Sequence, residues 1–121
     1  MFDLIGDYVV QSIVSALFCV LGLSMGQVAF KYAANSLNQT QSIFAPKTLI
    51  ILIIALLIYG ITTIAWIIIL RSVELGKIYP IMALAYIFVP LASLIFFKER
   101  FSINYYLGVI LIMIGIVVTF R

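Results

Sequence analysis

The sequence lacks histidine and has a single cysteine, Cys19, among its 121 residues. Histidine is the commonest metal ligand and general base, and one cysteine can form neither an internal disulfide nor a pair of metal ligands. We therefore expect a protein with no bound metal and no cofactor.

Charge is almost as scarce. Only 9% of the residues are charged, 66% are hydrophobic, and the mean hydropathy is +1.32. A soluble domain of this length needs more polar surface than such a composition supplies, so the bilayer is the expected solvent. The net charge of +3 comes from a few scattered side chains, which argues against a nucleic-acid partner and leaves membrane lipid as the expected surroundings.

Acidic residues number only four: Asp3, Asp7, Glu74 and Glu99. All four lie near the expected ends of hydrophobic segments, so no pair of carboxylates is available for hydrolytic chemistry within the membrane. The sequence also lacks a phosphate-binding glycine loop and a Ser-His-Asp set. It therefore predicts a protein that is not an enzyme.

Four hydrophobic segments are long enough to cross a bilayer, which takes roughly 20 apolar residues. They cover residues 9–32, 48–70, 75–97 and 103–120, and the second contains no charge. Pro80 and Pro90 interrupt the third, which we expect to be kinked near them. The sequence predicts an all-α membrane protein, a bundle of four transmembrane helices forming a single domain over residues 1–121.

The connections are short, except for residues 33–47, which contain the polar run NSLNQTQS. We expect this segment to be a loop, either a plain linker or a cover over a lateral opening.

The first segment is the least apolar, and its most informative feature is the set Ser24, Gln27 and Lys31. Spacings of three and four place these side chains on one helical face. Polar groups in a bilayer face other helices or a wet cavity. Two interpretations stay open: contacts between helices, with Lys31 extending to the interface, or a surface that lines a substrate path.

Tyrosines and glycines supply further candidates. Tyr79 and Tyr86 are seven residues apart, share a helical face, and are candidate substrate-binding residues, with ordinary packing as the alternative. Gly22 and Gly26 would allow close helix contact in the first segment. Gly108 and Gly115 lie nearly on one face of the last segment, where they could pack in the bundle or form an oligomer interface. Since four helices leave little room for a path, we expect an oligomer.

Several runs resemble one known family. They are GQVAFKYA (26–33), GKIYP (76–80), KERF (98–101) and LGVILIMIGI (107–116). Their order and spacing resemble an EamA-type unit of the drug/metabolite transporter superfamily over nearly the whole chain.

Four-helix members of that superfamily include small multidrug resistance exporters and flippase subunits for undecaprenyl-phosphate-linked aminoarabinose. The exporters use a glutamate eight residues before the lysine that matches Lys31, and Leu23 occupies that position here. The chain is more similar to the flippase subunits. This resemblance implies translocation of a polyprenyl-phosphate-linked sugar or related amphiphile across a bacterial inner membrane, by a homodimer or a heterodimer with a related four-helix subunit.

An anionic lipid phosphate attracts lysine and arginine near the headgroups. The basic candidates are Lys31, Arg71 and Lys77, and the sugar-phosphate would cross along Ser24, Gln27 and Tyr79. Two alternatives remain: an exporter of cations or small solutes, and a non-transporting membrane subunit that accompanies a glycosyltransferase.

Overall fold

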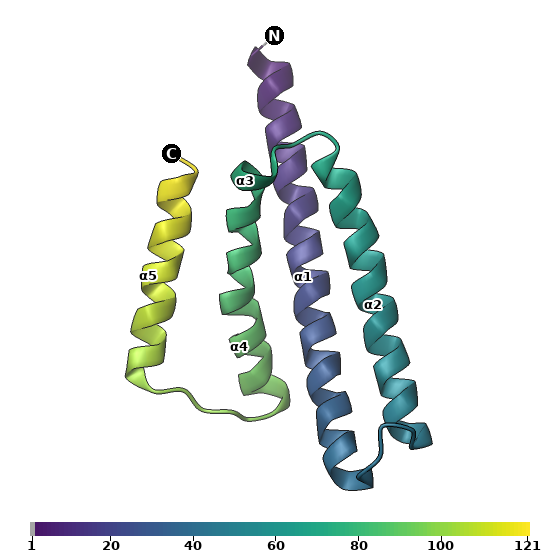
Figure 1. Cartoon of the computed structure of the whole chain (residues 1–121). Coiled ribbons are helices and arrows are strands. Elements are labelled where there is room, and N and C mark those ends of the chain that lie inside the picture. Colours follow the sequence, from purple (N-terminus) through teal and green to yellow (C-terminus); the bar gives the residue numbers. More distant parts are fainter. Residues whose placement is uncertain (1) are drawn as a thin grey trace.

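The computed structural model describes residues 2–121, with side chains described from residue 10 onward, so those of Asp3 and Asp7 lie outside the described part. The helices are α1 (Phe2–Thr40), α2 (Pro46–Leu70), α3 (Leu75–Ile78), the 3₁₀ helix η1 (Tyr79–Leu84), α4 (Ala85–Phe96) and α5 (Ile103–Thr119). Helices α1, α2, the α3–η1–α4 unit and α5 run alternately down and up (Figure 1). The expected four-helix membrane bundle is confirmed.

The expected loop over residues 33–47 is wrong in most of its length. Helix α1 continues to Thr40, and only residues 41–45 connect it to α2. The polar side chains of this segment satisfy each other: the Ser36 and Thr48 hydroxyls lie 2.9 Å apart, and those of Thr40 and Thr48 lie 3.1 Å apart. Pro46 then begins α2 at a position where no backbone N–H is needed. The polar residues after Tyr32 show where the apolar segment ends, but the helix itself continues past that point to Thr40.

The third segment changes its helix type at its first proline, where we expected a distortion. Pro80 lies in the first turn of η1, whose tighter winding joins α3 to α4. Pro90, in contrast, lies inside α4, which continues through it to Phe96. The distortion expected near the prolines is thus found at Pro80, whereas Pro90 does not interrupt α4.

Helices α1 and α2 pack through small side chains. The buried residues of α2 recur every seven positions, at Thr48, Ala55, Thr62 and Ile69. A Cβ added to Gly22 would lie 2.6 Å from Thr62 Oγ1, so the backbone of α1 directly contacts α2 there. Seven-residue spacing and small residues are typical of closely approaching membrane helices.

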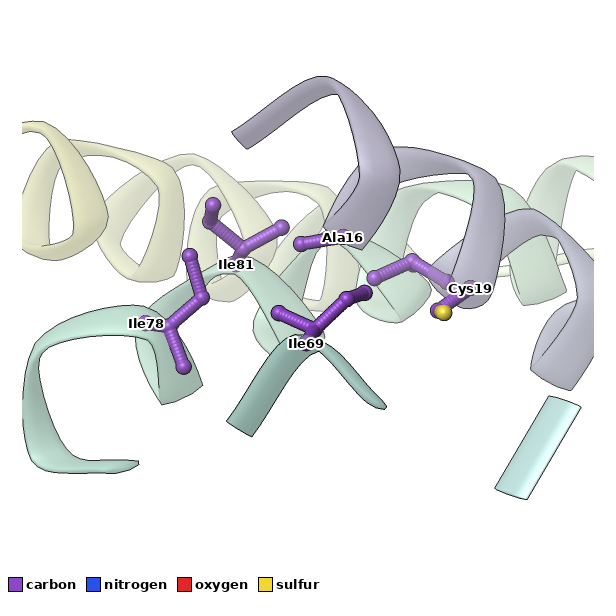
Figure 2. Close-up of a cluster of buried hydrophobic side chains, with 6 residues drawn as sticks. Ala16, Cys19, Ile69, Ile78 and Ile81 are labelled. Carbon is purple, nitrogen blue, oxygen red and sulfur yellow. The ribbon is translucent and has the colours of Figure 1, made fainter. Parts of the chain in front are cut away.

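The core lies where α1, α2 and the start of the third segment meet. Ala16 and Cys19 of α1 lie against Ile69 of α2 and against Ile78 and Ile81 (Figure 2). Helix α5 contributes nothing to this core: like α4 it has no buried residue, and it contacts mainly η1. The bundle is therefore tight on one side and open on the other.

Candidate functional site

The polar face of α1 is divided between two environments. Ser24 is buried, and its hydroxyl donates to the carbonyl of Val20 at 2.7 Å. That bond lies within the helix, so it gives Ser24 no path-lining contact. Gln27 and Lys31 are exposed, which leaves them available to a ligand at the bundle surface.

Gln27 is held by a residue on α2 that the sequence did not single out. Its Nε2 donates to the Tyr59 hydroxyl at 3.0 Å. The Tyr59 ring fills the space beside Gly26, where an added Cβ would lie 2.7 Å from the ring. It also lies 5.2 Å from the Phe30 ring, centroid to centroid. In the sequence, Tyr59 stands out only as the single tyrosine of the second segment, and nothing there indicates that it contacts Gln27.

The remaining candidates lie elsewhere. Arg71 follows the end of α2, and Lys77 forms an exposed ion pair with Glu74 at 3.3 Å. The Tyr79 ring, 58% exposed, lies edge-on to Trp66 with a centroid distance of 6.5 Å.

Figure 1 places the connection that holds Arg71 at the end of the bundle nearer the termini, and Lys31 lies toward the opposite end. Tyr86, also exposed, is on α4 between these ends. The structure thus divides the candidates into two groups: Gln27 and Lys31 at one end, and the residues from Arg71 to Tyr79 at the other.

Two hollows have linings that include none of these candidates. A polar pocket of about 190 Å³ lies between α1 and the end of α2, lined by Gln11, Ser12, Ser15, Ile68, Ile69 and Ser72. An apolar groove of about 540 Å³ lies along α5, lined by Ile87, Val109, Ile110, Met113, Ile114, Val117, Val118 and Arg121. The sequence-based interpretation singled out neither as a site.

Gly108 and Gly115, the expected oligomer interface, have no heavy atom within 4 Å of an added Cβ, apart from their own helix and chain neighbours. Among the described residues they pack against nothing in this chain. The expectation that they meet another subunit stays a prediction.

Helices long and apolar enough to span a bilayer, with polar side chains grouped at both ends, are typical of an integral membrane protein. The chain belongs to the EamA-like transporter family, which matches residues 6–121. The resemblance inferred from the sequence is thereby confirmed.

Two groups of relatives are similar over most of their length. The probable 4-amino-4-deoxy-L-arabinose-phosphoundecaprenol flippase subunit ArnE of Yersinia pseudotuberculosis serotype O:3 (strain YPIII) is 32% identical over 110 residues, covering 91% of this chain and 92% of the relative. The subunit ArnF of Pseudomonas fluorescens (strain Pf0-1), with the same probable activity, is 31% identical over 114 residues, covering 88% and 85%. No solved structure matches the chain significantly.

Proposed function

We propose that this chain is one subunit of a flippase that moves a polyprenyl-phosphate-linked sugar across a bacterial inner membrane, without covalent chemistry. The observation that carries the proposal is the similarity, over about nine-tenths of the chain, to proteins named as subunits of such a flippase. The absence of an acid at the Leu23 position supports it, because an exporter of cations needs a buried carboxylate.

The proposed path uses both groups of polar residues. Lys31 at one end, and Arg71 and Lys77 at the other, attract the lipid phosphate on the two sides of the membrane. The sugar meets Gln27 next to Lys31, Tyr79 next to the opposite end, and Tyr86 between them. Ser24 is buried on the same face of α1, and its hydroxyl donates to the Val20 carbonyl within its own helix. The polyprenyl chain stays in the surrounding lipid.

The proposed assembly is a homodimer or a pair with a related four-helix subunit. Helix α5 buries none of its residues within this chain, and Gly108 and Gly115 leave its surface open to close contact. Relatives with two subunit names, ArnE and ArnF, support a paired arrangement.

Reconstitution in vesicles tests the proposal. A labelled polyprenyl-phosphate sugar placed in one leaflet should become accessible to a membrane-impermeant reagent on the other side faster with the protein, alone or with its second subunit, than in empty vesicles. Transport of a cationic dye instead would favour the exporter alternative. Absence of any transport, together with co-purification of a glycosyltransferase, would favour the accessory subunit.

Lys31→Ala gives the first residue-level check. We expect a loss of about tenfold or more in transport, since a charge-assisted hydrogen bond to phosphate contributes roughly 1.5–3 kcal/mol. Lys47→Ala is the matched control, because Lys47 lies on the same half of the bundle and is bonded to Gln39 at 3.1 Å. Wild-type transport by Lys31→Ala would reduce the polar face of α1 to a packing feature.

A further inference from the structure

The α1–α2 hairpin extends beyond the connection between α4 and α5. The ring of Tyr32 lies 4.8 Å from that of Phe97, centroid to centroid, so the end of α4 is level with Tyr32. Helix α1 continues for eight more residues to Thr40, which is about 12 Å at 1.5 Å per residue. Figure 1 shows the hairpin ending well below the connection. Residues 97–102, here called the shelf, are therefore set back from the hairpin tip.

The hairpin tip itself carries apolar side chains. Ile43 is 53% exposed and Phe44 is 82% exposed. Such residues are most stable in the membrane interface, not in bulk water. The interfacial layer is roughly 6 Å thick on each side of the hydrocarbon. With the tip at the outer edge of the interface, a shelf about 12 Å further inward lies about 6 Å inside the hydrocarbon boundary. Lysine and arginine side chains are long enough to extend from that level back to the lipid phosphates.

Positive charge gathers on this shelf. Lys98 and Arg100 are exposed on it, and exposed Lys31 is adjacent to Tyr32 at the same level. Glu99 is the one acid among residues 97–102. Within the part of the chain whose side chains are described, none of the three cations has an acidic oxygen within 4 Å, whereas Lys77 at the opposite end is paired with Glu74.

We propose that the shelf binds the phosphate of the polyprenyl lipid, with Lys98 and Arg100 acting beside Lys31. This rests on the proposed function and deepens it, because it describes the phosphate site at the Lys31 end of the bundle and adds two binding residues there. Charges near the hydrocarbon boundary are less screened than in water, and arginine can bind phosphate through two parallel hydrogen bonds. Gln27 lies one helical turn deeper than Lys31, so a sugar attached to a phosphate on the shelf would reach the amide held by Tyr59.

The backbone at Lys98 offers a sharp test variant. Lys98 has φ of 54°, in the left-handed region that favours glycine, and the next N–H, that of Glu99, bonds back to the Ser93 carbonyl at 3.3 Å. Lys98→Gly should therefore ease the backbone while removing a charge. A purely structural role for this position predicts that the variant is at least as stable and binds lipid unchanged; the shelf predicts equal or higher stability with weaker binding.

The experiment measures undecaprenyl phosphate binding to the full chain in nanodiscs of neutral phosphatidylcholine. Lys31→Gln, Lys98→Gly and Arg100→Gln should each weaken binding, by up to about tenfold. Lys47→Gln, on the same end but on the projecting hairpin, should change it less than about twofold. Thermal unfolding of each variant gives its stability. Phosphatidylglycerol, tested as a competitor, should displace undecaprenyl phosphate only at much higher concentration.

Three results would overturn the assignment. They are unchanged binding in Lys31→Gln, Lys98→Gly and Arg100→Gln alike, an equal loss in Lys47→Gln, or equal competition by phosphatidylglycerol, which would show that the shelf binds bulk lipid. Failure of the shelf can be separated from failure of the proposed function. Wild-type transport by Lys98→Gly and Arg100→Gln would contradict the shelf assignment and leave the proposed flippase function standing. Selective binding of undecaprenyl phosphate by a wild-type protein that shows no transport would support the shelf assignment and contradict the proposed flippase function.

Discussion

The two halves of the bundle use glycine in opposite ways. In the α1–α2 hairpin, Gly22 and Gly26 each have a side chain of α2 where their own Cβ would be. In α5, Gly108 and Gly115 have open space at that position. Because a membrane gives no hydrophobic drive between helices, close packing is what holds them together. The hairpin has that packing within this chain, and α5 requires it from a neighbour.

The largest expected effect comes from filling the hairpin contact. Gly22→Leu should destabilise the protein by about 3 kcal/mol, since the new side chain overlaps Thr62 and forces the helices apart. Gly60→Leu is the control, because no heavy atom lies within 4 Å of its added Cβ beyond its own helix and neighbours. Unfolding in mixed micelles measures both. Equal stability of the two variants would mean that α1 and α2 are not in close contact at Gly22 in the folded protein.

The corresponding changes in α5 should affect assembly and leave the fold intact. Gly108→Leu and Gly115→Leu should weaken subunit association by about tenfold or more, because tight helix contacts need small residues. Native mass spectrometry and crosslinking measure this, and unfolding of the monomer should be unchanged. If both variants assemble like the wild type, the subunit interface lies on another helix.

A smaller effect is expected where the two helices of the hairpin share a polar contact. Gln27→Leu removes the amide, and Tyr59→Phe removes only the hydroxyl that accepts the amide's hydrogen bond at 3.0 Å. We expect both to slow transport by up to about tenfold, with the larger loss in Gln27→Leu, since a hydrogen bond contributes about 1 kcal/mol. A loss of transport in Gln27→Leu with no change in Tyr59→Phe would show that Tyr59 does not position the amide.

The smallest effect is expected at the hairpin tip. Thr48→Val removes hydroxyl contacts to Ser36 and Thr40 and should cost about 1 kcal/mol of stability. Thr63→Val is the matched control, because the exposed Thr63 hydroxyl bonds only to the Tyr59 carbonyl one turn away in its own helix. Equal unfolding free energies in the two variants would show that the tip cluster adds nothing to the hairpin.

Local patterns predicted the helices well. The charge-free segment 48–70 corresponds closely to α2, and the distortion expected near the prolines takes the form of the 3₁₀ helix η1 at Pro80. The continuation of α1 to Thr40 was missed, because polar residues such as Asn35 and Gln39 do not end a helix when α2 lies beside it. Polarity reports where hydrocarbon ends, which is a different property from where a helix ends.

The sequence by itself determined that the chain lies in a membrane and crosses it as helices, since a bilayer requires every backbone group to bond within its own segment. It also determined the family, because the short runs that carry the resemblance, with their order and spacing, can be read directly from the sequence. Tertiary structure alone decided which glycines are packed, that Gln27 meets Tyr59, and that Tyr32 lies beside Phe97. These contacts depend on the rotation and axial offset of each helix. In helices that are apolar on nearly every side, no amphipathic pattern records either quantity.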